Sequence, residues 1–334
     1  MTPIMKRPQF HLGLARLSDK VHAYLQPDGG LGLSNAGLVG SKRDALLVDT
    51  LFDLGHTQRM LDEIARAVTG DIGRVVNTHH NGDHCWGNQL VRGAEIIGHK
   101  RCAELMAALP PESLQRVKLA PDSVPAARAL REGLEPFDFS GIELTPPTTF
   151  VPDEGMRIEV DGVAVDLIYV GPAHTAGDVV VHLPEEGITF AGDVIFRLCA
   201  PIGWEGTFER WVEALERIAA LDGDTIVPGH GPVCGKEGAL EMRDYLLYVR
   251  GEAKRQFDAG ASLEEAASRI DLGPYADWLE SERIVFSVDR AYREFRGEPY
   301  DKPVDFLRLA TASADIRERH RAARAAARRA GTPS

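Results

Sequence analysis

The sequence has few cysteines, and none of them form a closely spaced pair. It contains four, with no CxxC motif among them: Cys85, Cys102, Cys199 and Cys234. Small proteins that depend on disulfides carry many cysteines at regular spacings, and zinc ribbons carry CxxC pairs. We therefore expect reduced thiols rather than a disulfide framework.

Long apolar runs are also absent. No stretch approaches the roughly 18 apolar residues that a membrane-spanning helix needs. Residues 1–20 lack the order of a charged and then an apolar region that a signal peptide has. We expect a soluble, cytoplasmic protein with no membrane partner.

Basic residues are outnumbered by acidic ones. The chain has 38 Lys and Arg against 50 Asp and Glu, a formal net charge of −12. Surfaces that bind nucleic acid are normally basic, so this balance argues against such a partner. The exception is residues 317–329, which are rich in Arg and Ala. We interpret this stretch as a solvated terminal helix, the alternative being a contact with nucleic acid or membrane.

Several catalytic motifs are missing as well. There is no phosphate-binding glycine loop, no Ser or Cys nucleophile elbow and no internal repeat. What the chain does have is a short apolar run that leads into a turn bearing His79, His80, Asp83 and His84. Imidazole nitrogen and carboxylate oxygen are ligands of zinc-like ions. The turn therefore predicts a metal site, the alternative being a polar turn that caps the next helix.

Three later segments repeat this chemistry. His174, Asp193 and His230 each follow an apolar run typical of a buried strand. Each is flanked by glycine, which permits positive φ angles and close approach of the backbone. The pattern indicates that distant strand ends bring ligands to one place.

The order H-x-x-x-D-H, then His, Asp and His, resembles the metallo-β-lactamase superfamily from about Ser34 to about Val233. This resemblance implies an α/β fold, an αββα sandwich of two sheets between helices. The 334 residues, 44% of them hydrophobic, are enough for one large core and a smaller accessory region. We expect a catalytic domain over residues 1–237 and a C-terminal helical extension over residues 238–334.

The resemblance also implies a ligand set for Zn²⁺, as one or two ions, with Mn or Fe as alternatives. Two of the matching residues are ligands of the first metal, namely His79 and His174. Three are ligands of the second metal, namely Asp83, His84 and His230. Asp193 matches the carboxylate that bridges both ions.

Asn81 departs from the family pattern because a second His is usual at this position. An amide oxygen is a weaker ligand than imidazole for such an ion. We expect a well-formed second site and a first site that is weak, completed by water or filled by a different metal, with Asn81 as a candidate weak ligand. Asp49 resembles the acidic residue beneath the family's site, where it orients a ligand.

A bound ion of this kind converts water into a nucleophile near neutral pH and polarises a carbonyl group. Asp83 is the candidate catalytic residue, because it can orient that water or accept its proton. A purely structural metal is the alternative. Structural sites are normally closed by four protein ligands, whereas this set leaves room for water.

Two segments are candidates for the substrate pocket. Residues 110–152 are rich in proline, which predicts a lid or substrate loop. The segment after Asp193 carries Phe196 and Trp204, which we expect in the pocket wall. The helical extension lies over the mouth of the site or builds a homodimer contact, and the sequence leaves both open.

For the substrate, the segments 34–39, 48–51, 171–175, 178–184 and 243–246 resemble the cyclase-thioesterase branch of aromatic polyketide pathways, of the actinorhodin type. This implies a small-molecule acyl thioester or polyketide as the substrate of a metal-dependent hydrolase in secondary metabolism. Two alternatives stay open. One is a lactonase or another hydrolase of the same fold, and the other is a catalytically silent ligand-binding protein.

Overall fold

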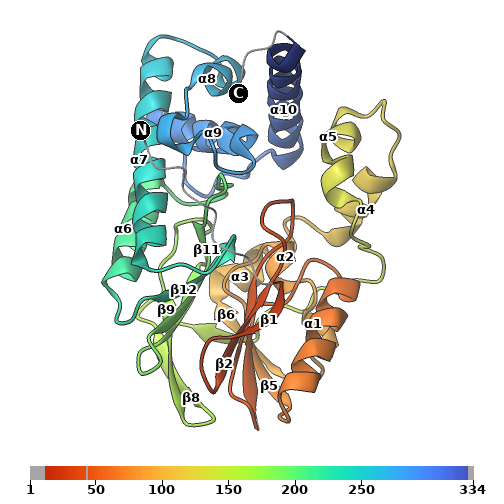
Figure 1. Ribbon diagram of the computed structural model, residues 1–334, viewed down its shortest axis with the longest axis vertical. Coiled ribbons are helices and arrows are strands. Elements are labelled where there is room, and N and C mark those ends of the chain that lie inside the picture. Colours follow the sequence, from red (N-terminus) through yellow and green to blue (C-terminus); the bar gives the residue numbers. More distant parts are fainter. Residues whose placement is uncertain (1–11, 43, 330–334) are drawn as a thin grey trace.

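Strands form where short β-branched runs occur, and they make two sheets that face each other (Figure 1). The computed structural model describes residues 12–42 and 44–329. The first sheet has the order β1 (Gly13–Arg16), β2 (Val21–Leu25), β3 (Ala36–Val39), β4 (Ala45–Val48), β5 (Ile72–Val76), β6 (Glu95–His99) and β7 (Thr149–Val151). The second has the order β12 (Thr225–His230), β11 (Ile188–Phe196), β10 (Val179–Leu183), β9 (Val163–Tyr169) and β8 (Met156–Val160).

The main core lies between the two sheets. Along β9, Val163, Val165 and Leu167 are buried and alternate with half-buried residues, as the two-residue period of a strand requires. They pack in one cluster with apolar side chains of the first sheet, such as Val48 and Val76. The inner faces of the two sheets therefore form a single apolar layer.

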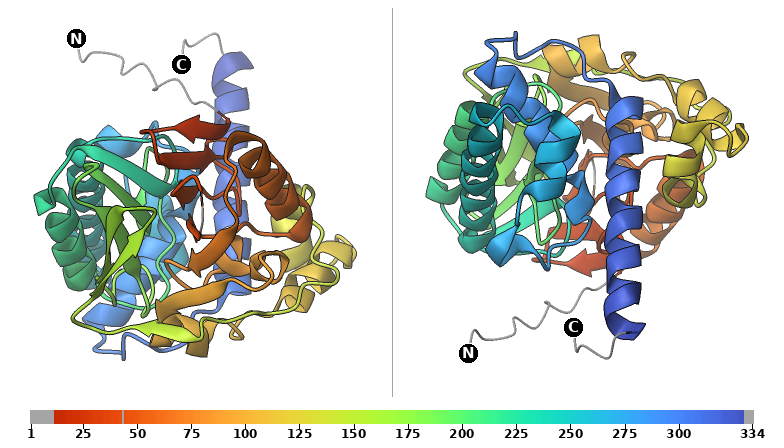
Figure 2. Two further views of the ribbon diagram at one scale, coloured as in Figure 1. Left: turned by 90° about the horizontal axis from the view of Figure 1, so that it is seen from below. Right: turned by 90° about the horizontal axis from the view of Figure 1, so that it is seen from above.

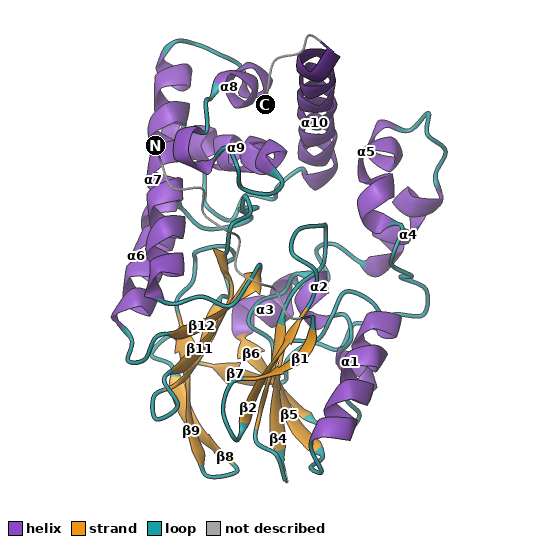
Figure 3. Ribbon diagram, viewed as in Figure 1, coloured by secondary structure: helices purple, strands orange, loops and turns teal. Residues whose placement is uncertain are grey.

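Helices cover the outer faces, which completes the expected αββα sandwich (Figure 3). On the first sheet, α1 (Leu54–Ala67) buries Met60 and Ile64, and its N-cap Asp53 accepts a hydrogen bond from the backbone N–H of His56. On the second sheet, α6 (Phe208–Ala220) and α7 (Lys236–Asp258) pack side by side. The fold class predicted from the sequence is thus confirmed.

Parallel pairing brings the polar strand ends to one edge. β4, β5, β6 and β7 pair in parallel, and so do β11 and β12. Asp49 directly follows β4, and its backbone N–H donates to the carbonyl of Val76 at the end of β5. The turn that begins at Asn77 contains α2 (Gly82–Cys85) and is followed by η1 (Asn88–Leu90). This edge is where the candidate ligands gather.

The proline-rich segment between β6 and β7 is largely helical. After α3 (Lys100–Leu105) come α4 (Pro111–Leu119) and α5 (Pro125–Leu134). Each of these two helices begins on its proline, where the missing N–H costs nothing. Beyond them, Phe137 and Phe139 pack against Phe52. The stretch is therefore a folded part of the molecule, tied to the core by aromatic contacts.

The C-terminal extension stands over the same edge. It comprises α8 (Leu263–Arg269), η2 (Gly273–Tyr275), η3 (Ser281–Arg283), α9 (Ile284–Phe295) and α10 (Phe306–Arg329). Figures 1 and 2 show α9, α10 and the α4–α5 pair grouped at the end of the sheets near α2, with α10 projecting past the body. Glu280 has a left-handed φ of 55°, and the regular helix α9 begins beyond it at Ile284. No helix in the described ranges is long and apolar enough to cross a membrane.

Candidate metal centre

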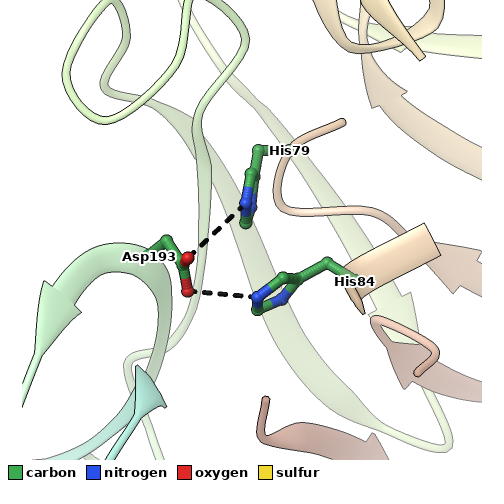
Figure 4. A group of neighbouring side chains, drawn as sticks. All are labelled: His79, His84 and Asp193. Carbon is green, nitrogen blue, oxygen red and sulfur yellow. Dashed lines mark ion pairs between the residues drawn. The ribbon is translucent and has the colours of Figure 1, made fainter. Parts of the chain in front are cut away.

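The candidate ligands form a cluster of side chains around the carboxylate of Asp193. Figure 4 shows this carboxylate facing His79 and His84. Its Oδ1 lies 3.1 Å from Nε2 of His84. Its Oδ2 lies 3.4 Å from Nε2 of His230, 3.5 Å from Nε2 of His174 and 3.8 Å from Nε2 of His79. Four imidazoles from three separate segments therefore face one carboxylate.

Asp83 extends the cluster on one side. Its Oδ2 lies 3.3 Å from Nε2 of His230 and 3.8 Å from Nε2 of His84. Among the described residues, two sets of three ligand atoms lie within 4.8 Å of one another. One set is His79, His84 and Asp193, and the other is Asp83, His84 and His230. The structure thus brings together all six residues that the motifs single out.

The backbone around Asp193 is shaped to aim its carboxylate at the histidines. The register of β11 against β12 shifts on both sides of Gly192, which has a φ of 52°. Such a bulge redirects the side chain that follows it. A Cβ at Gly229 of the neighbouring strand would overlap Oδ1 of Asp193. Gly229 therefore leaves space for the carboxylate, and Gly192 leaves space for the Thr78 side chain.

Every one of the four histidines is fixed through its Nδ1. The distances are 2.8 Å from His84 to Oδ2 of Asp49, 2.7 Å from His174 to the carbonyl of Ile202, 3.1 Å from His230 to the carbonyl of Leu33, and 3.0 Å from His79 to Oγ1 of Thr78. Carbonyl and carboxylate oxygens only accept, so Nδ1 donates. The Nε2 atoms are left facing the centre, the arrangement that metal-binding histidines adopt.

Asp49 links two of these histidines. Its Oδ1 accepts from the backbone N–H of Thr78 at 2.7 Å, and its Oδ2 accepts from the Thr78 hydroxyl at 2.8 Å as well as from His84. Because the Thr78 hydroxyl hydrogen goes to Asp49, its oxygen accepts from Nδ1 of His79. Asp49 is fully buried, and burial raises the pKa of its carboxyl group. It lies behind the ligands rather than among them.

Asn81 directs its side chain at the same region. Its Oδ1 lies 2.8 Å from Nε2 of His174. Burial lowers the pKa of His174 to about 4, although Asp193 and the hydrogen bond to the Ile202 carbonyl act in the other direction. Because the neutral ring donates through Nδ1, it keeps a lone pair on Nε2. An amide oxygen and an imidazole nitrogen, two ligand atoms, therefore face a shared position. His80, next in the chain, is outside both sets of ligand atoms.

The carboxylates of Asp83 and Asp193 draw positive charge to the centre of the cluster. Burial lowers the pKa of His79. Burial acts in the same direction on His230, but the carboxylates of Asp193 and Asp83 outweigh it and raise the pKa of His230 to about 9. Burial opposes ionisation of Asp193, yet His230 and His84 together hold its pKa well below the usual range. Positive charge is thus strongly favoured at the centre.

Several buried polar atoms of the site lack a hydrogen bond, which bears on whether a cation fits there. Nε2 of His79, Nε2 of His84 and Oδ1 of Asp193 are buried and have no hydrogen-bond partner among the described residues. Buried polar atoms without partners are rare, and each requires an explanation. Nitrogen and carboxylate donors in this mixture are those of Zn²⁺ and similar divalent ions. The residues present therefore fit a bound metal.

Asp49 is the one anchoring group that the sequence indicated; the other anchoring groups and much of the pocket wall were missed. The carbonyls of Leu33 and Ile202 carry no sequence signal, because every residue has a carbonyl. Thr78 had one available signal, its position directly before His79. Val304 and Phe306, which face the site from the C-terminal extension, lie about 75 residues beyond the last ligand motif and have no pattern that links them to it.

Comparison with known proteins agrees with this geometry. The chain is 23% identical over 302 residues to a linear primary-alkylsulfatase of Pseudomonas sp. (strain ATCC 19151), which covers 80% of this chain and 57% of that protein. It is 27% identical over 219 residues to a hydroxyacylglutathione hydrolase of Rhizobium meliloti (strain 1021), covering 65% of this chain and 68% of that one. The solved structure of the stereoselective inverting sec-alkylsulfatase Pisa1 from Pseudomonas sp. matches with a TM-score of 0.64 and 16% identity, over 86% of this chain and half of that one.

The match to the family model covers the part of the chain that carries the metal centre. The chain spans little more than half the length of the alkylsulfatases it resembles. The model of the metallo-beta-lactamase superfamily matches residues 29–230, which contain all six clustered residues. The chain belongs to the metallo-beta-lactamase superfamily and has the fold of its hydrolases.

Proposed function

We propose that this protein is a metal-dependent hydrolase of acyl thioesters and related uncharged carbonyl esters with an apolar acyl group. The observation that carries the proposal is an apolar cavity of about 220 Å³ against the metal centre. His174, Asp193 and His230 form part of its surface, together with Asn81 and Asp83. A substrate held in this cavity has its reacting group beside the ligand cluster.

The walls of this cavity, here called the chamber, come from many separate parts of the chain. Apolar side chains dominate them, including Trp86, Met106, Leu109, Phe196, Trp204 and Phe306. Phe196 and Trp204 are the two pocket residues expected from the sequence. The C-terminal extension supplies part of the wall, which supports its placement over the mouth of the site. Such a lining favours an alkyl or aryl group, since affinity grows with the apolar area removed from water.

The charges along the chamber favour an uncharged substrate. In the described part of the chain, the only Lys or Arg that lines it is Arg283, and both Nη atoms of Arg283 pair with Glu280 at 2.6 and 2.7 Å. Glu205 and Asp301 add acidic groups. An anionic group would bury its charge beside these carboxylates with no free cationic side chain to pair with it. We therefore expect neutral carbonyl esters to be better substrates than sulfate esters.

The roles of the ligands follow from their positions. His79, His174 and Asp193 would hold one ion with help from the Asn81 oxygen, while Asp83, His84, His230 and Asp193 would hold another. A bound Zn²⁺ supplies a Lewis acid and a water of lowered pKa. Asp83 accepts a proton or orients water through its carboxylate, which lies at the floor of the chamber. The apolar walls exclude bulk water from the acyl group.

The hydroxyacylglutathione hydrolase relative supports this choice, because its name denotes hydrolysis of an acyl-glutathione. Within the proposed class, a polyketide thioester is one member that the aromatic walls accommodate. A second candidate is an alkyl sulfate esterase, favoured by the alkylsulfatase relative that spans 80% of this chain. The pairing of Arg283 with Glu280 places this candidate second.

A panel of substrates separates these possibilities. Zinc-loaded protein would be assayed on the octanoyl thioester of N-acetylcysteamine, an octanoate ester, a γ-lactone with an alkyl chain, and octyl sulfate. We expect the thioester to be hydrolysed fastest, with activity lost on chelation and in His174→Ala but kept in Leu307→Ala, a change at an exposed position on α10. Faster hydrolysis of octyl sulfate would overturn the proposal in favour of the second candidate. Binding of all four compounds without turnover would favour a silent binding protein.

A further inference from the structure

We propose that Phe306 closes the far end of the chamber and thereby sets the length of the acyl group that the site accepts. The choice of an acyl group as the ligand rests on the proposed function. The position of Phe306 at the end of the chamber is independent of that function, because it follows from the residues that line the cavities.

Two cavities lie back to back in this part of the molecule. The chamber adjoins a second cavity of about 300 Å³ bounded by α5, α10 and the loop at Gly30. Four side chains line both cavities and so stand between them: Leu31, Ile202, Arg283 and Phe306. We call these four residues the partition.

The chemistry changes across the partition. The chamber side is mainly apolar, whereas the second cavity is also lined by Glu132, Glu280, Glu282 and Arg317. Arg317 pairs with Glu282 at 3.7 Å, and its Nη2 donates to the carbonyl of Ala129 at 3.0 Å. Each methylene buried in the chamber raises affinity about fourfold. Once a chain reaches the partition, further methylenes have no apolar space to enter.

Phe306 is the member of the partition that can be removed without disturbing the metal centre. Arg283 is held by its ion pair with Glu280. Ile202 carries the carbonyl that fixes His174. Phe306, by contrast, is held by ring contacts, stacked on Trp204 with centroids 5.4 Å apart and tilted against Phe286 at 6.0 Å. It is 9% exposed and is the first residue of α10.

The two cavities would join if the Phe306 ring were absent. In Phe306→Ala the space occupied by the ring becomes available to a straight chain, and this space connects the chamber to the apolar side chains of Ala310 and Ala314 in the second cavity. We expect the wild type to lose activity sharply beyond a certain acyl length. The variant should extend that limit by about three to four carbons, with a gain of about fourfold per added methylene in kcat/KM for the longer chains.

The experiment compares wild type, Phe306→Ala and Leu307→Ala on thioesters of N-acetylcysteamine with acyl groups from butyryl to tetradecanoyl. Leu307 is the matched control, because it neighbours Phe306 on α10 but is 39% exposed and lines neither cavity. We expect its length profile to coincide with that of the wild type. An unchanged length limit in Phe306→Ala would overturn the proposal.

Calorimetric binding of straight-chain alcohols from butanol to decanol gives a readout that needs no turnover. If the wild type hydrolyses no thioester but Phe306→Ala binds longer alcohols than the wild type, the proposed function fails and the partition stands. If thioesters are hydrolysed and neither profile moves, the partition fails and the function stands. Should Phe306→Ala lack the circular dichroism spectrum of the fold, Leu31→Ala opens the same partition from the opposite side and carries the same expectation.

Discussion

Gly229 and Asp193 sit so close on neighbouring strands that a Cβ at Gly229 would overlap Oδ1 of the aspartate. A methyl group at this position must therefore displace the central carboxylate of the cluster. A substitution at Gly229 therefore tests the metal centre without removing any of the candidate ligand residues.

We expect Gly229→Ala to lower zinc affinity by roughly 10–100-fold, the range seen when the support of a metal ligand is disturbed. The measurement is competition for zinc with a chromogenic chelator. The matched control is Gly251→Ala on α7, where an added Cβ meets nothing within 4 Å. That change should raise stability by about 0.5–1 kcal/mol, because alanine is the better helix former, and leave zinc affinity unchanged. Equal zinc affinity in both variants would mean that Asp193 is not a ligand.

We expect the side chain at position 81 to determine how many metal ions the centre binds. Its amide oxygen faces His174 at 2.8 Å but is a weaker ligand than imidazole. We expect protein purified without chelator to contain about one tightly held ion per chain, rising to about two in Asn81→His. Metal analysis of both proteins after desalting measures this. About two ions in the wild type would show that Asn81 suffices as a ligand, and no ion in either protein, even after zinc is added, would sink the metal-centre assignment.

The residues of the centre were readable from the sequence because strand ends have recognisable flanks. His230, with Gly229 and Gly231 beside it, is the last residue of β12, as expected for a strand end, whereas Asp193 lies inside β11, three residues before that strand ends, where the bulge at Gly192 turns its side chain toward the site. Parallel pairing then brings such ends to one edge without any further information. The αββα sandwich that the family resemblance implied was also confirmed.

Other features depend on tertiary contacts and had no local signal. The proline-rich stretch at 110–152 suggested irregular structure, yet Pro111 and Pro125 each begin a helix, since proline at the first helical position breaks nothing. The Phe306 side chain reaches the chamber only because α9 and α10 fold back over the sheets. The sequence pattern does not indicate that these helices return to the site. The part of the chamber wall that comes from the C-terminal extension could therefore be found only in the structure.

Asp49 offers a third test, because it holds His84 without reaching the chamber. In Asp49→Asn one oxygen becomes an NH₂ group, which cannot accept hydrogen, so either the bond from the Thr78 backbone N–H or the bonds from the Thr78 hydroxyl and His84 Nδ1 are lost. We expect zinc affinity to fall by roughly 10–100-fold. Asp53→Ala is the control, since Asp53 is another buried aspartate but caps α1. Its loss should cost about 1 kcal/mol of stability with zinc affinity unchanged. A drop in zinc affinity of the same size in both variants would contradict a specific role for Asp49.

The two histidines beside Asp83 predict a pH dependence that zinc removes. Burial alone would lower the pKa of His230, but Asp193 and Asp83 raise it from 6.5 to about 9, and the pKa of His84 is raised as well by the same two carboxylates. A raised pKa means that the folded, metal-free protein binds protons more tightly than the unfolded chain. The resulting stability is fully present below pH 6.5 and is lost as the pH rises through about 9.

We therefore expect the melting temperature of chelator-treated protein to fall between pH 6.5 and 9. Zinc needs neutral imidazole and releases these protons when it binds, so the zinc-loaded protein should show a much smaller change over the same range. Thermal unfolding followed by circular dichroism measures both curves. In His230→Gln the metal-free curve should flatten, because only His84 remains to titrate in the cluster. A metal-free protein that grows more stable toward pH 9 would contradict the positive charge that the geometry assigns to His230.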